Sequence, residues 1–265
     1  MTALGFLYPG HAAEDDYPRM EQLLGSDIRM TLVHTEIPET PEIKDTARPE
    51  APEIADAGED ARSVDALREM GSADRLAAGV EELRLSGAEA VVWACTSGSF
   101  VYGWQGAHEQ VRGLARAAGL PASSTSFGFA HAVREIGVRR VAVAATYADE
   151  VAGLFAAFLG DAGVEVVSVR GAGGSGRAAA EVASWGYDQI LALARAADHP
   201  DAGTLLLPDT ALHTVSHIPA LEKALSKPVL TANQVTVWEA LRLSARRVNA
   251  PRLGTLFTRE PLVQV

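Results

Sequence analysis

The sequence predicts an α/β protein with parallel sheets and crossover helices. Short apolar runs alternate along the chain with segments whose apolar residues recur at helical spacing. Many of these runs end in glycine, proline or small polar residues, as expected where a strand leaves a sheet. The two halves also repeat the same order of strands and helices, which favours two similar lobes that enclose one site.

In the first half, the periodicity predicts strands at residues 4–8, 28–33 and 91–94 and helices at 63–85 and 107–118. Pro9 and Gly10 end the first strand. Ser72 can cap a second segment within the first helix. Gly119 and Pro121 stop the helix that begins at residue 107.

In the second half, the same criteria predict strands at 138–145, 164–169, 205–207 and 229–231 and helices at 151–159, 178–197, 218–225 and 234–243. The glycine-rich loop 171–176 lacks the Gly-Lys-Ser/Thr ending of a phosphate-binding P-loop, so we expect a loop on the substrate side. Residues 36–60 are rich in proline and acidic residues, which is typical of either a solvated surface excursion or a lid.

The composition is that of an ordinary soluble globular protein. The chain has 265 residues, of which 48% are hydrophobic and 22% charged, and its formal net charge is -11. Nucleic acid and anionic membranes repel such a chain, so neither is expected as a partner. Neither a signal peptide nor an apolar stretch long enough to span a bilayer is recognisable, so the expected location is the cytoplasm.

Cys95, the only cysteine of the chain, is the leading candidate for a catalytic residue. It stands at the end of an apolar run and directly before Thr96, Ser97 and Gly98. Ligands bind at the carboxyl ends of parallel strands. A thiol there can carry a proton or, as a thiolate, add to an activated alkene. Thr96 and Ser97 could bind a substrate carboxylate and stabilise an enediolate. The alternative is a buried, inert cysteine.

The run 205–207 in the second half is followed by Pro208, Asp209 and Thr210, which repeats the pattern around Cys95. Cys95 and Asp209 would then act on opposite faces of one substrate. Asp209 could move a proton, or it could cap the helix that follows. An ionised Asp209 would repel a substrate carboxylate, so either burial raises its pKa or it meets a cationic or hydrogen-bond-donating part of the ligand.

Four further residues are candidates for contacts with the substrate. Tyr147 and Thr210 offer hydroxyl donors from the second lobe, and Pro9 and His11 follow the first strand. Hydrogen bonding within loops and caps is the alternative for the hydroxyls, and a surface loop is the alternative for His11.

Three stretches resemble one known superfamily: residues 94–100 around Cys95, residues 137–142 with Thr146 and Tyr147, and residues 218–222 with Asn233 and Gln234. They are similar to the aspartate/glutamate racemase superfamily, in its branch of maleate cis-trans isomerases and arylmalonate decarboxylases. The resemblance covers most of the chain and is weakest at residues 36–60. It implies two pseudo-symmetric flavodoxin-like (Rossmann-like) lobes, each a parallel sheet flanked by helices, with the site in the cleft between them.

The resemblance also implies a mechanism without a metal or organic cofactor. Racemases and maleate isomerases of this type carry a cysteine in each lobe, and Cys95 matches the first of these. Asp209 stands where the second would be. The decarboxylases carry their cysteine in the second lobe. The expected lobes are residues 1–118 with 228–265, which include Cys95, and residues 119–227, which include Tyr147 and Asp209.

The leading hypothesis is a cofactor-independent isomerase or racemase, similar to maleate cis-trans isomerase, that acts on a small carboxylate or dicarboxylate. Cys95 would be the nucleophile or proton carrier, and Asp209 the acid or base on the opposite face. One alternative is an arylmalonate decarboxylase-like enzyme in which Cys95 protonates an enediolate and gives the enantiomer opposite to that of the known decarboxylases. Another is a non-catalytic carboxylate-binding protein. We expect a homo-oligomer.

Overall fold

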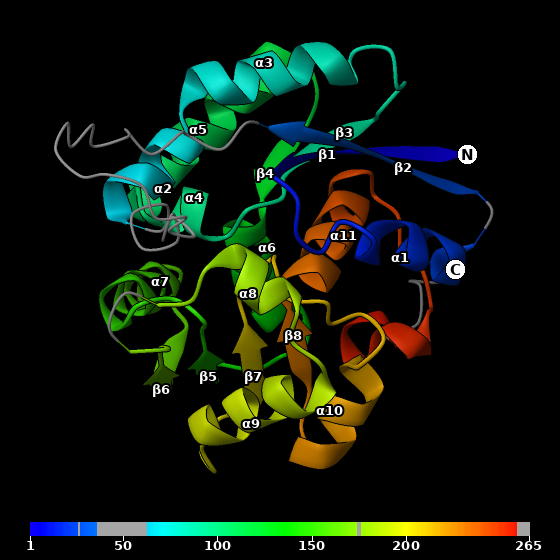
Figure 1. Ribbon diagram of the computed structural model, residues 1–265. Helices are drawn as coiled ribbons and strands as arrows, with labels where there is room; N and C mark the ends of the chain where they lie inside the picture. Colours follow the sequence, from blue (N-terminus) through cyan, green and yellow to red (C-terminus); the bar gives the residue numbers. More distant parts are fainter. Residues whose placement is uncertain (26, 36–62, 174–175, 259–265) are drawn as a thin grey trace, which may run out of the picture.

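Two four-stranded parallel sheets form the framework of the protein, one above the other in Figure 1. The computed structural model describes residues 1–25, 27–35, 63–173 and 176–258. The strand orders are β2-β1-β3-β4 and β6-β5-β7-β8, so the two sheets repeat one topology. This confirms the predicted class of two similar α/β lobes. The predicted excursion or lid at residues 36–60 lies outside the described residues.

The first sheet consists of β1 (Thr2–Pro9), β2 (Ile28–Thr35), β3 (Ala90–Trp93) and β4 (Ala122–Ser124). Its helices are α1 (Asp16–Leu24), α2 (Val64–Met70), α3 (Ala73–Leu83), α4 (Ser97–Phe100) and α5 (Gly103–Ala118). All four residues of β3 are buried, because helices cover both faces of a parallel sheet.

The predicted helix 63–85 is two helices, α2 and α3, with a corner between them. Ser63 caps α2 by accepting a hydrogen bond from the Ala66 amide. At the corner, a Cβ on Gly71 would lie 2.1 Å from the carbonyl oxygen of Gly98. Gln110 donates to the carbonyls of both Gly71 (2.8 Å) and Gly98 (2.7 Å). The corner therefore supports the segment that follows Cys95.

The second sheet consists of β5 (Arg140–Ala144), β6 (Glu165–Arg170), β7 (Thr204–Leu207) and β8 (Val229–Thr231). Its helices are α7 (Asp149–Asp161), α8 (Ala179–Ala183), α9 (Tyr187–Ala197) and α10 (Ile218–Leu225), and the 3-10 turns η2 (Pro251–Leu253) and η3 (Thr255–Phe257) follow later in the chain. The predicted helix 178–197 is interrupted, and Gly186 occupies the N-cap position of α9.

Two helices lie between the sheets: α6 (Thr125–Glu135), which follows β4, and α11 (Ala232–Leu243), which follows β8 (Figure 1). They cross closely, since a Cβ on Gly128 would lie 2.9 Å from Cγ1 of Val235. β4 and α6 were not predicted from the sequence; β4 reads Ala-Ser-Ser and is not an apolar run.

The strands are divided between the sheets differently from the expected ranges. β4 lies within residues 119–227 but pairs with β3, and β8 lies within residues 228–265 but pairs with β7. The chain therefore enters the second lobe after α6 and leaves it after β8.

Among the helices of the described residues, none combines the length and the apolar composition that a membrane span requires.

Asp16 links the two lobes through hydrogen bonds. Its carboxylate accepts hydrogen bonds from the Thr214 amide (3.1 Å), the Val215 amide (3.4 Å) and the side chain of Asn233 (3.2 Å). Only 2% of Asp16 is exposed, and this burial raises the pKa of its carboxyl. The carboxyl ends of β1 and β7 are thus held together by chain segments far apart in sequence.

Glu239 on α11 is a buried charge with a complete set of partners. Its carboxylate, which is 0% exposed, accepts hydrogen bonds from Ser123 (2.6 Å), His131 (3.0 Å) and Nε of Arg242 (2.7 Å). Burial acts to raise the pKa of Glu239, but the bonds from Arg242 and His131 outweigh it and hold the pKa below its ordinary value. The network joins α6, α11 and β4.

Glu239→Ala is expected to lower the free energy of unfolding at pH 7 by about 2 to 3 kcal/mol, because it leaves Arg242 and His131 without their buried partner. The pKa of Glu239 is lower in the folded protein than its ordinary value of 4.5, so the stabilisation that its carboxylate provides is complete above pH 4.5. It is lost as the pH falls through the folded-state value. Urea denaturation between pH 3 and pH 7 should therefore show the difference from wild type shrinking in acid. Glu165→Ala, at an exposed ion pair with Arg140, is the control.

Candidate active site

Cys95 follows β3 and is 3% exposed. The Gly98 amide donates a hydrogen bond to its Sγ (3.2 Å), and Oγ of Ser97 lies 3.8 Å from the same sulfur. A Cβ on residue 98 would lie 3.1 Å from Sγ, so glycine lets this amide approach closely. An N–H directed at sulfur stabilises negative charge there, which favours a reactive thiolate.

Thr96 and Ser97 lie beside this thiol. Thr96 is 0% exposed, and its carbonyl accepts a hydrogen bond from Ser126 (2.8 Å). Within the described residues, its hydroxyl has no hydrogen-bond partner. A buried hydroxyl without a partner costs free energy, so a ligand atom that accepts its hydrogen bond would be favoured there. Ser97 is 7% exposed.

Asp209 follows β7, at the position that corresponds to Cys95 in the second lobe, and is 4% exposed. One carboxylate oxygen accepts a hydrogen bond from the Ala211 amide (2.9 Å). The other accepts a hydrogen bond from the hydroxyl of Thr146. The Ala211 bond closes a local turn and does not cap a helix, because the next helix, α10, begins only at Ile218 with His217 at its N-cap position.

Tyr147 connects the two groups of predicted residues. Its hydroxyl donates to the carbonyl of Pro208 (2.9 Å), next to Asp209, and its ring lies 5.8 Å from that of Phe100 on α4. Tyr147 is 3% exposed, so this contact belongs to the interior. Through Phe100 and Tyr147, the segment after Cys95 packs against the segment around Asp209.

Tyr8, which was not among the predicted site residues, is a second connection. Its hydroxyl donates to the carbonyl of Thr210 (2.8 Å) and accepts from the Ala13 amide (3.0 Å). Burial, followed by the negative charges of Asp209 and the acidic residues that follow β1, raises the pKa of Tyr8. Its place at the carboxyl end of the first strand was the signal that could have identified it.

Asn233 is the other residue without an assigned role, although it belongs to a stretch that carries the resemblance. Its Nδ2 donates to the carbonyl of Thr210 (3.2 Å) as well as to Asp16. Thr210 itself is 7% exposed, and its carbonyl accepts hydrogen bonds from Tyr8 on β1 and from Asn233 on α11. These bonds connect residues more than 20 positions apart, which a local pattern does not reveal.

Pro9 and His11 differ in their placement. Pro9 ends β1 and pairs with Thr35 on β2. The side chain of His11 is 73% exposed, contacts Glu14 (3.0 Å) and lies over the ring of His34, with ring centroids 4.0 Å apart. Donor atoms of His11, Glu14 and His34 all lie within 4.8 Å of one another, so these three side chains are the described residues that could hold a metal ion.

The two strand ends therefore offer different chemistry. The first supplies one thiol with an amide directed at it and a buried hydroxyl beside it. The second supplies a carboxylate whose two oxygens both accept hydrogen bonds from the protein. Such a site can move a proton, or add a sulfur atom, from one side of a bound substrate.

Asp209→Ala is expected to lower the free energy of unfolding by about 1 to 2 kcal/mol, because the Ala211 amide and the Thr146 hydroxyl lose their acceptor. Asp209→Asn keeps the oxygen that accepts from Ala211 and should recover part of this loss. Urea denaturation measures both variants. Equal stability of wild type and Asp209→Ala would contradict a structural role for this carboxylate.

Comparison with known proteins identifies the family. A family model described as arylmalonate decarboxylase matches residues 61–257. The arylmalonate decarboxylase of Bordetella bronchiseptica is 33% identical over 177 residues, which are 66% of this chain and 73% of that relative.

Solved structures of two kinds of enzyme share the fold. A glycine-to-cysteine mutant of arylmalonate decarboxylase, associated with sulfate, is 26% identical with a TM-score of 0.71 and coverage of 97% of this chain and 100% of that chain. A mutant maleate cis-trans isomerase from Nocardia farcinica, with a covalently bound succinylcysteine intermediate, is 17% identical with a TM-score of 0.81 and coverage of 98% and 99%. Since the family model spans most of the sequence and a relative is 33% identical, the chain belongs to the arylmalonate decarboxylase family.

Proposed function

We propose that the protein decarboxylates disubstituted malonates without a cofactor, with Cys95 as the proton donor. The observation that carries this proposal is that the ends of two corresponding strands differ: a thiol, Cys95, follows β3, whereas a carboxylate, Asp209, follows β7. Protonation of an enediolate from one face needs a single thiol, whereas proton exchange on both faces needs a second acid or base. Asp209 is poorly suited to that second role because Thr146 and Ala211 already donate to its oxygens.

The steps follow from the groups around Cys95. The bond between the α-carbon and one carboxylate breaks, CO₂ leaves, and the electron pair moves into the remaining carboxylate to form an enediolate. Hydrogen bonds from Thr96 and Ser97 would stabilise that charge. The S–H of Cys95 then delivers a proton to the α-carbon, and solvent reprotonates the thiolate, which the Gly98 amide stabilises meanwhile.

The test is turnover of methyl-phenylmalonate in D₂O, followed by NMR and chiral chromatography. We expect CO₂ release and one deuterium at the α-carbon. The product should be a single enantiomer, opposite to that formed by the Bordetella bronchiseptica relative under the same conditions. A racemate, or the same enantiomer, would contradict protonation by Cys95 alone. Absence of CO₂ release from a panel of arylmalonates would contradict decarboxylation.

Cis-trans isomerisation of a small unsaturated dicarboxylate is the second candidate. The observation that favours it is the buried thiol with an amide directed at sulfur, since addition of one thiolate to maleate needs no second thiol. Rotation about the resulting single bond and loss of the thiolate would give fumarate. Mass spectrometry of the protein with maleate should then detect an adduct on Cys95, and NMR should detect fumarate.

A non-catalytic carboxylate-binding protein is the candidate from another class. It predicts that Cys95→Ser binds an arylmalonate as the wild type does and that neither protein turns it over. Turnover by the wild type that disappears in Cys95→Ser supports an enzyme and contradicts this alternative.

A further inference from the structure

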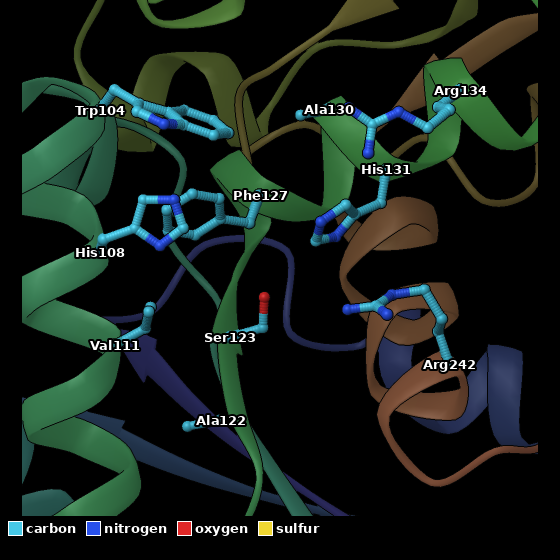
Figure 2. Close-up of a pocket in the computed structure, with 10 residues that line it drawn as sticks. All are labelled: Trp104, His108, Val111, Ala122, Ser123, Phe127, Ala130, His131, Arg134 and Arg242. Carbon is cyan, nitrogen blue, oxygen red and sulfur yellow. The ribbon is translucent and has the colours of Figure 1, made fainter. Parts of the chain in front are cut away.

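A pocket of about 240 Å³ opens between α5, β4, α6 and α11 (Figure 2). None of the predicted site residues lines it. Ser123 of β4 lines the pocket, whereas the next residue, Ser124, bonds Ser99 on α4 (2.8 Å), in the segment that follows Cys95. Because successive side chains of a strand point to opposite faces, the pocket and the Cys95 segment lie on opposite sides of β4.

One wall of the pocket is a cluster of flat rings. The ring of Phe127 lies 5.1 Å from that of Trp104 and 4.4 Å from that of His108. Burial, with the nearby charges of Arg112 and His131, lowers the pKa of His108, so its imidazole is neutral at pH 7. Figure 2 shows these three side chains gathered on one side of the pocket. This wall suits the face or edge of an aromatic ring.

The opposite wall carries positive charge. Arg242 donates to Glu239 through Nε and Nη2, so its Nη1 remains as a donor, and Nδ1 of His131 contacts the same carboxylate (3.0 Å). The buried Glu239 thus fixes two pocket residues in place. Arg134 adds an exposed guanidinium, which Figure 2 shows on the same side as His131.

The charge balance of this wall favours an anion. Arg242 and Glu239 neutralise each other, and the side chain of Arg134 has no hydrogen bond or ion pair within the described part of the chain. The wall therefore has a positive charge left over in a protein whose formal net charge is -11. Arginine N–H groups bind a carboxylate through charge-assisted hydrogen bonds.

We propose that this pocket is a second binding site, separate from the Cys95 site, for a small carboxylate that carries an aromatic ring. The ring packs against Trp104 and Phe127, and the carboxylate binds Arg134 and Nη1 of Arg242. The volume lies below the roughly 300–1,000 Å³ of sites for drug-sized ligands, which matches a ligand with a single ring. The proposal does not depend on the reaction at Cys95, because the two sites share no residue.

The test uses two of the four tryptophans as reporters. Nε1 of Trp104 reports on the pocket. Nε1 of Trp93 reports on the Cys95 segment, since a Cβ on Gly98 would lie 3.3 Å from it. Phenylacetate is titrated into ¹⁵N-labelled protein, and the indole resonances are assigned with Trp104→Phe and Trp93→Phe. We expect a saturable shift of Trp104, and a much weaker response to phenylacetamide, which has no charge.

Arg134→Gln should weaken this binding by about tenfold or more, the factor expected when a charge-assisted hydrogen bond is lost. Arg116→Gln, at an exposed position on α5, should leave it unchanged. Arg134→Lys keeps the charge and should retain part of the affinity. The proposal is overturned if phenylacetate shifts only Trp93, if Trp104 does not respond, or if Arg134→Gln binds as tightly as Arg116→Gln.

Discussion

Cys95→Ala is expected to lower kcat/KM for the decarboxylation of an arylmalonate by about 10³-fold or more. The thiol is the proton donor in the proposed reaction, and a positioned acid contributes roughly 10²- to 10⁴-fold. The side chain is small and buried, so the fold should tolerate the change. Steady-state kinetics measure the loss, and circular dichroism checks the fold. Binding of a non-reactive malonate should persist, because the predicted carboxylate donors are other residues.

Two further variants make this result specific to the thiol. Cys95→Ser keeps a hydroxyl in nearly the same place, but a hydroxyl is a far weaker acid, so it should be nearly as inactive as Cys95→Ala. Ser244→Ala, at the end of α11, removes a partly buried hydroxyl that donates to the Ala240 carbonyl and should keep full activity. Turnover by Cys95→Ala within tenfold of wild type would place the proton donor elsewhere.

Asp209→Cys is expected to change the stereochemical outcome from one enantiomer to a mixture. The substitution places a second thiol at the strand end that corresponds to Cys95 in the other lobe, so the enediolate can receive a proton from either side. The same pair of thiols can remove and return the α-proton of the product. We therefore expect racemisation of 2-phenylpropionate, and α-hydrogen exchange in D₂O at least tenfold faster than in wild type.

Asp209→Ser is the matched control for this variant. It also removes the acceptor for Thr146 and Ala211, so it carries a comparable loss of stability, but a serine hydroxyl is too weak an acid to replace the thiol. Its product should remain a single enantiomer. If Asp209→Cys folds and its product is as enantiopure as that of wild type, residue 209 does not lie on the opposite face of the substrate.

The sequence by itself determined the class of fold and most of its elements. The apolar runs at 91–94 and 205–207 are strands because their residues are apolar without interruption, as burial between two layers of helices requires. The resemblance around Cys95 agrees with the family that the comparisons establish. These features are local in the chain, so periodicity and short motifs are enough to reveal them.

Tertiary structure decided what depends on contacts between distant segments. β4 becomes a strand because its backbone pairs with β3, although its side chains are too small and polar to predict one. The oxygens of Asp209 are occupied because Thr146 lies beside it, 63 residues away in the chain. Tyr8 reaches Thr210 across 202 residues, and Ser123 reaches Glu239 across 116. Hydrogen bonds of this kind depend on how the two lobes pack, and that packing cannot be predicted from local sequence patterns.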